Sequence, residues 1–161
     1  MRGMAIRCYI PTTLTALRSM LTDVRAVAPD AQGRSLRGEE FESAEFDAMC
    51  IAAALAANAV FDPAETEPGT DAAPERRVIV AYDAPESSPT EPLTEGFDLI
   101  SLGEVDLPRV ASFHLDEDAV WNDAVRLALE SGAEAAEDRL GESDLLWYDA
   151  TELPSLLDER G

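Results

Sequence analysis

Hydrophobic positions alternate or run together in short segments that are typical of β-strands. We expect strands at residues 5–10, 78–82, 97–102, 109–115 and 145–148. The run Val78–Tyr82 contains no polar position, which predicts a central strand covered on both faces. The short connection through Leu107 and Pro108 joins two of these strands and favours an antiparallel hairpin.

Apolar positions at helical spacing predict helices between the strands. The first helix begins after Pro11, and its inner stripe is formed by Leu14, Leu17, Leu21 and Val24. A longer helix is expected from Phe41 to Phe61; its later turns are apolar nearly all round, so it should be buried. Two more helices are expected after Asp116, which would cap the first of them, and over residues 151–159.

This order of elements predicts an α/β fold with a single domain over residues 4–160. Two connections through helices imply parallel neighbouring strands, so we expect a mixed, mostly parallel sheet of about five strands, with helices packed on its faces. Residues 28–38 predict a loop. Residues 62–76 and 84–96 predict acidic, proline-rich surface loops.

The charge balance narrows the possible partners. The chain has 33 acidic residues and 12 basic ones, all arginine, for a formal net charge of −21. Such a surface repels nucleic acid and anionic membranes over most directions of approach, so neither is expected as a partner. The absence of lysine excludes a phosphate-loop lysine, a Schiff base and a lysine general base.

The lengths of the apolar stretches and the spacing of the cysteines predict an intracellular protein. The apolar stretch Ala48–Ala57 is shorter than the roughly 20 residues that a membrane span needs, and the N-terminal residues are not expected to act as a signal peptide. We therefore expect a cytoplasmic protein. Cys8 and Cys50 follow no disulfide spacing and are expected to be buried, reduced thiols.

Four segments of the chain resemble landmarks of an uncharacterised actinobacterial family of small intracellular proteins, a domain of unknown function. They are Arg7–Leu14 (RCYIPTTL), Arg76–Ala81 (RRVIVA), Arg109–Asp116 (RVASFHLD) and Leu145–Leu153 (LLWYDATEL). The resemblance covers nearly the full chain, with variable acidic loops between the landmarks. It implies no activity and no catalytic residue.

A candidate ligand pocket can be assembled from polar residues at the predicted strand ends, because ligands collect outside the carboxyl ends of parallel strands. Its members are Thr12, Thr13, Asp83, His114, Asp116 and Asp149. The three carboxylates could hold Mg²⁺, and a threonine could steady a phosphate at a helix N-terminus. The same residues also suit structural roles: Asp116 and a threonine as helix caps, and Asp149 with Glu152 as a capping box.

His114 is the one histidine of the chain, which is too few for a zinc cage with two cysteines so far apart. It could act as a general base beside Asp83 or Asp116, or lie in the structure as a hydrogen-bonded side chain. Trp121 and Trp147 are expected in the core, with a partner-binding patch as the alternative.

These observations favour a non-catalytic accessory or binding protein that contacts another protein or a small molecule. No cofactor and no resident metal are expected for that function. The alternative is a Mg²⁺-dependent phosphate-handling enzyme that uses the carboxylates at strand ends. The sequence leaves the oligomeric state open.

Overall fold

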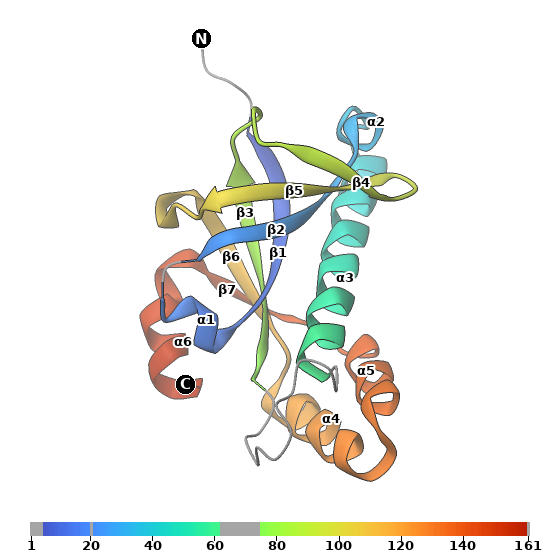
Figure 1. The fold of residues 1–161 in the computed structure, drawn as a ribbon, viewed down its shortest axis with the longest axis vertical. Helices are drawn as coiled ribbons and strands as arrows, with labels where there is room; N and C mark the ends of the chain where they lie inside the picture. The colour runs from blue at the N-terminus through green and yellow to red at the C-terminus, as the bar shows by residue number, and fades with distance from the viewer. Residues whose placement is uncertain (1–4, 20, 62–74, 161) are drawn as a thin grey trace.

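The computed structural model describes residues 5–19, 21–61 and 75–160, and within them it contains one seven-stranded sheet (Figure 1). The strand order is β4-β5-β2-β1-β3-β6-β7, and all six neighbouring pairs are antiparallel. The strands are β1 (Ile6–Thr13), β2 (Thr22–Pro29), β3 (Arg77–Ala84), β4 (Thr90–Thr94), β5 (Phe97–Glu104), β6 (Val110–Leu115) and β7 (Leu146–Asp149). The helices are α1 (Leu14–Leu17), α2 (Ala31–Arg34), α3 (Glu39–Phe61), α4 (Asp118–Ser131), α5 (Ala133–Gly141) and α6 (Leu153–Arg160), with 3-10 turns η1 (Leu107–Arg109) and η2 (Ala150–Glu152).

The prediction of a mixed, mostly parallel sheet of about five strands is wrong. The first difference is at β2. The spacing of Leu17, Leu21 and Val24 predicts that the first helix continues through these residues. The helix ends at Leu17, and Val24 instead starts an alternation with Ala26 and Ala28, all three of which face the same core cluster. Because β2 returns beside β1, the expected helical crossover is replaced by an antiparallel pair.

Strand β4 was missed as well. Residues 84–96 were predicted to be a surface loop, but Thr90–Thr94 form an exposed edge strand that carries Pro92 and pairs with β5. The expected hairpin between β5 and β6 does not form, because β5 pairs with β2 and β4 while β6 pairs with β3 and β7. Most of the loop predicted at 62–76 lies outside the described residues.

One face of the sheet is covered by α3. Its buried residues are nearly all alanine, and Ala48, Ala52, Ala53 and Ala56 pack on Tyr9, Val27, Ile79 and Ala81 of the central strands. Small side chains let the helix backbone lie close to the sheet. The predicted long helix at Phe41–Phe61 is therefore confirmed, two residues longer at its start.

The same helix is less buried than its composition suggested. It is the one helix of the described residues that is long and apolar enough to cross a membrane, and only 33% of that apolar window is buried. The core helix of a soluble protein satisfies the same criteria, so this is weak evidence for a membrane span. Cys50 lies on the exposed side of α3, which corrects the expectation that it is buried, whereas Cys8 is fully buried in β1.

The opposite face of the sheet, here called the α1–α6 face, is flanked by α1, α6 and η1 (Figure 1). Strands β2, β4 and β5 run across the direction of β1, β3 and β6, so the sheet is strongly twisted. The buried residues of this face come from five strands and include Ile10, Val80, Tyr82, Ile100 and Phe113.

A helical hairpin of α4 and α5 packs at the C-terminal end of α3. Trp121 is buried there, with its ring 5.6 Å from that of Phe61, as expected for a core residue. Trp147 is 62% exposed on the edge strand β7, so its predicted core position is wrong.

Candidate functional site

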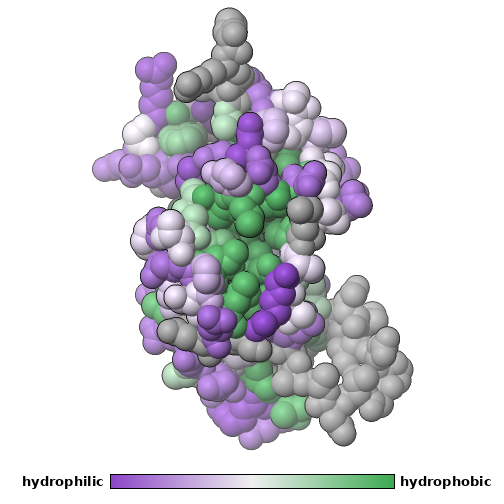
Figure 2. Space-filling model, turned by 90° about the vertical axis from the view of Figure 1, so that its left-hand side faces the viewer, coloured by the Kyte–Doolittle hydropathy of each residue, from purple (hydrophilic) through white to green (hydrophobic). Residues whose placement is uncertain are grey.

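A cavity of about 780 Å³ opens on the α1–α6 face of the sheet. Figure 2 shows an apolar hollow on this side of the molecule, with hydrophilic residues around it. Its lining comes from α1 and the residues after it, from β3 and β6, from the segment 104–109, and from α6. The volume falls in the range of small-molecule sites, roughly 300–1,000 Å³.

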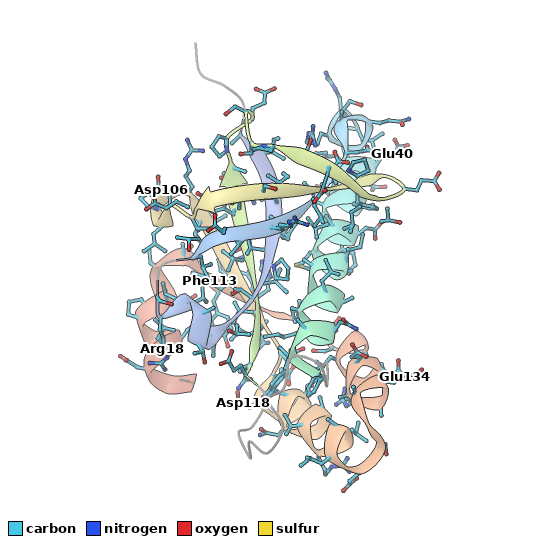
Figure 3. All side chains as sticks on the ribbon, viewed as in Figure 1. Arg18, Glu40, Asp106, Phe113, Asp118 and Glu134 are labelled. Atoms are coloured by element: carbon cyan, nitrogen blue, oxygen red, sulfur yellow. The ribbon has the colours of Figure 1, made fainter. Side chains whose placement is uncertain are left out.

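The floor of the cavity consists of buried sheet residues, all of them apolar except for the hydroxyl of Tyr82. Val80, Tyr82 and Phe113 are at most 1% exposed, and Val110 lies beside them. Leu17, Leu21, Leu107 and Leu153 form the walls. In Figure 3, Phe113 lies between Asp106 and Arg18, which mark two sides of the opening. The lining residues come from segments far apart in the chain, so no local sequence pattern predicts the cavity.

Tyr82 is the polar residue of the floor. Its hydroxyl oxygen accepts a hydrogen bond from the backbone N–H of Asp106 at 2.8 Å, where the chain enters η1. This bond ties the segment between β5 and β6 to the central strand β3. The cavity is therefore bounded on that side by a turn held in place by a buried side chain.

Four charged residues line the cavity, and all of them are exposed: Arg18, Glu104, Asp106 and Arg109. Arg18 donates to the carbonyl of Leu157 at 2.8 Å, and Arg109 donates to the carbonyl of Asp83 at 3.2 Å. The rim therefore carries two charges of each sign, in contrast to the strongly acidic chain as a whole.

The structure places the predicted site residues elsewhere and does not bring the six together. Asp83 forms an ion pair with Arg7 across β1 and β3, with Nε and Oδ1 2.7 Å apart. The hydrogen bond to the Asp83 carboxylate raises the pKa of the Arg7 guanidinium. Arg77, the partner of Asp116, lies at the other end of β3 from Asp83, about 20 Å away at about 3.3 Å per residue.

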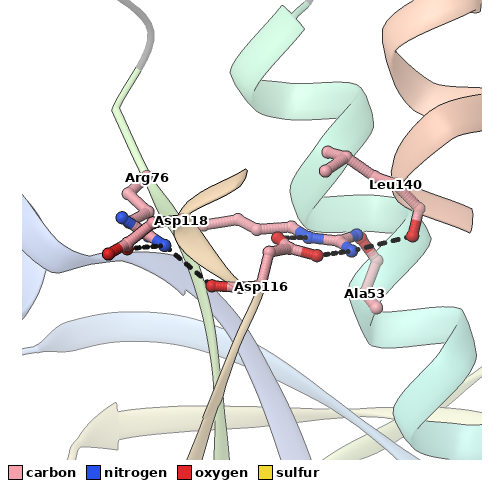
Figure 4. Close-up of polar contacts among 6 residues, drawn as sticks. Ala53, Arg76, Asp116, Asp118 and Leu140 are labelled. Atoms are coloured by element: carbon pink, nitrogen blue, oxygen red, sulfur yellow. Dashed lines mark hydrogen bonds and ion pairs between the residues drawn. The ribbon is translucent and has the colours of Figure 1, made fainter. Parts of the chain in front are cut away.

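Asp116 forms the most buried ion pair of the described residues, with Arg77 (Figure 4). The side chains are 0% and 3% exposed, and both carboxylate oxygens accept from the guanidinium at 2.7 Å. Arg77 also donates to the carbonyls of Ala53 in α3 and Leu140 in α5. The pair therefore joins the sheet to two helices, and Asp116 does not cap α4, which begins after Glu117.

Of the candidates Thr12, Thr13 and Asp149, two have structural hydrogen bonds. Thr13 caps α1 by accepting a hydrogen bond from the backbone N–H of Ala16 at 3.1 Å. Thr12 pairs with Val78 of β3, whose side chain lies on the α1–α6 face. Asp149 forms the expected capping box with Glu152, and its bonds to Thr151 lower the pKa of the Asp149 carboxyl. Asp149 pairs with Ser112 of β6, which pairs with Ala81 of β3, so two strand spacings separate Asp149 from the strand that carries Asp83.

His114 lies between Ile79 of β3 and Trp147 of β7. Its Nε2 is 2.9 Å from the hydroxyl of Ser112, and burial lowers the pKa of the imidazole. A serine next to a histidine could form a nucleophile–base pair, but Ser112 is only 5% exposed, and neither residue is among those that line the cavity on the α1–α6 face.

The described residues offer no metal centre: no group of three or more histidine, cysteine, aspartate or glutamate side chains could hold an ion. The strand ends explain this. In an antiparallel sheet, successive strands end at opposite edges, so carboxylates that follow neighbouring strands are separated instead of gathered.

Besides a hollow of about 540 Å³ whose lining includes Arg7, Glu45 and Asp83, two more hollows flank α3. One, of about 690 Å³, is lined by carboxylates that include Glu39, Glu40, Asp47 and Glu95. The other, of about 460 Å³, lies between α3 and the end of α5 and contains Phe46 and Cys50. Neither has a floor of sheet residues comparable with that of the cavity on the α1–α6 face.

Comparison with known proteins identifies a family but no function. Residues 6–157, nearly the whole chain, match a protein family described as a family of unknown function (DUF6912). No curated protein and no solved structure matches the chain.

Proposed function

Since the chain belongs to the DUF6912 family, whose function is unknown, we propose a function from its geometry: it is a non-catalytic protein that binds an apolar small molecule in the cavity on the α1–α6 face. The observation that carries this proposal is the size of the cavity together with its buried apolar floor. The leucines of the cavity walls are partly exposed to water, and their burial by an apolar ligand that rests on the floor would be favourable.

The charge distribution supports the same choice of site. Over most of the surface the acidic residues repel anions, while the floor of the cavity has no charged residue and its rim is balanced. A ligand reaches this opening without crossing a strong local field of one sign.

The setting of this function is part of the proposal. We place the protein in the cytoplasm of an actinobacterium, because its four sequence landmarks resemble an intracellular family from that group. The net charge of −21 supports the exclusion of nucleic acid and anionic membranes as partners.

The proposal can be tested with a neutral, environment-sensitive dye such as 6-propionyl-2-dimethylaminonaphthalene. Titration with the protein should shift the dye emission to the blue and saturate at one site per chain. Leu17→Trp adds a large side chain to the wall and should abolish saturable binding. Leu129→Trp is the matched control, because Leu129 is 86% exposed on α4 and does not line the cavity.

Two outcomes would contradict the proposal: no saturable binding to the unmodified protein, or equal binding by both tryptophan variants. Circular dichroism and thermal unfolding of each variant confirm that the comparison is made between folded proteins.

A further inference from the structure

Tyr82 has a hydrogen-bonding group that the fold uses only in part. The side chain is 1% exposed and lines the cavity, and its oxygen accepts from the N–H of Asp106 at 2.8 Å. A phenol also has one proton to donate. Among the described residues, no oxygen or nitrogen accepts that proton.

The bond from Asp106 also restricts where the proton can point. The N–H of Asp106 occupies one lone pair of the hydroxyl oxygen, so the O–H does not point at the Asp106 nitrogen. A buried donor without an acceptor is unfavourable, and such groups in native proteins are usually satisfied by water or by a ligand. Because Tyr82 lines the cavity, a molecule bound there could accept this hydrogen bond.

The charges around the cavity decide what kind of acceptor fits. Apart from the Tyr82 hydroxyl, the floor is formed by apolar residues such as Val80 and Phe113, and a carboxylate placed on them would lose its hydration for a single hydroxyl donor. The two arginines of the rim are matched by two carboxylates, Glu104 and Asp106, so the rim has no net charge that would offset this cost. A buried ionised group is therefore disfavoured.

We infer that the ligand is a neutral, mostly apolar molecule with an acceptor oxygen, such as a ketone, ester or ether, which accepts a hydrogen bond from the Tyr82 hydroxyl. This inference rests on the proposed function and narrows it to a class of ligand. The apolar body lies on Val80 and Phe113, and the oxygen sets its orientation.

The test compares 2-decanone with 2-methyl-1-decene, which has the same shape but carries a CH₂ group in place of the oxygen. Binding of each is measured by calorimetry on the full chain and on Tyr82→Phe. The loss of the hydroxyl should weaken the ketone about 3- to 10-fold and leave the alkene unchanged or slightly tighter. For each compound, binding to Tyr82→Phe is compared with binding to the unmodified protein, so the hydration free energy of the compound itself cancels.

Tyr9→Phe is the matched control, because Tyr9 is also buried but lies on the α3 face of the sheet. It should leave the binding of both compounds unchanged. Decanoate and decylamine are the charged members of the series and should bind more weakly than the ketone.

The outcomes separate the two proposals. If neither neutral compound binds the unmodified protein, the proposed function itself fails. If both bind and Tyr82→Phe affects them equally, or if decanoate binds more tightly than 2-decanone, the cavity is a binding site and the inference about its ligand is overturned.

A second measurement avoids the variant altogether, in case Tyr82→Phe does not fold. In the unmodified protein, the infrared carbonyl stretch of ¹³C-labelled 2-decanone should move to lower frequency on binding, as for a hydrogen-bonded ketone. A stretch at the frequency found in hydrocarbon solvent would contradict the inference.

Discussion

Arg77 and Asp116 face each other inside the protein, joined by two hydrogen bonds of 2.7 Å between guanidinium and carboxylate. Arg77 begins β3 and Asp116 follows β6, so the pair closes the end of the sheet. Through Ala53 and Leu140 the same guanidinium reaches α3 and α5. One side chain thus connects three parts of the fold that are distant in sequence.

Removal of one partner should destabilise the protein strongly, because the other charge stays buried without compensation. We expect Arg77→Met and Asp116→Leu each to lower the free energy of unfolding by about 3–5 kcal/mol, and the double variant to lose much less than the sum. Urea unfolding measures this. Arg126→Met is the control, since its ion pairs on α4 are exposed. Additive losses in the double variant would argue against a coupled pair.

The contact between α3 and the sheet should tolerate only small side chains. Ala52 is fully buried against the sheet, so Ala52→Leu should lower the free energy of unfolding by about 1–3 kcal/mol through overpacking. Ala54→Leu makes the same change two residues further along, on the exposed side of the helix, and should be within about 0.5 kcal/mol of the parent. Equal effects in denaturant unfolding would show that α3 does not lie as described.

The burial of His114 predicts a dependence of stability on pH. Its folded pKa is lowered by burial, so the unfolded chain binds the proton more readily. The stabilisation from neutral His114 is therefore complete above its unfolded pKa, about 6.5, and is lost as the pH falls below that value. Denaturant unfolding between pH 7.5 and 5.5 should show the parent losing stability relative to His114→Gln. Parallel pH profiles for the two proteins would contradict this account.

The two cysteines should differ in reactivity. Cys8 is fully buried, and burial raises the pKa of its thiol to about 12, so little thiolate forms. Cys50 is exposed on α3. A maleimide at neutral pH should modify Cys50 in the folded protein and leave Cys8 unmodified until denaturant is added. Peptide mass mapping identifies the site, and Cys50→Ser should abolish labelling. Modification of native Cys8 would contradict its placement.

Much of the local structure follows from the sequence. The alternation Ile6, Cys8, Ile10 marks β1, and the unbroken run Val78–Tyr82 marks the buried β3. The spacing of Asp149 and Glu152 predicts a capping box that is present. Each of these signals depends on residues only a few positions apart. The local backbone determines which positions of a strand face the core and which side chains can reach a helix end.

The tertiary structure alone decided which strands pair and what the polar residues at their ends do. Parallel or antiparallel pairing depends on the path of β2 and β4, which carry weak local signals, and on burial shared among distant segments. The antiparallel order sends Asp83 and Asp116 to opposite ends of the sheet and brings Tyr82 next to Asp106 at the edge of a cavity. Such contacts depend on the strand register, and the register is set by the free energy of burying the whole sheet. That free energy is summed over segments far apart in the chain, so a short stretch of sequence does not predict it.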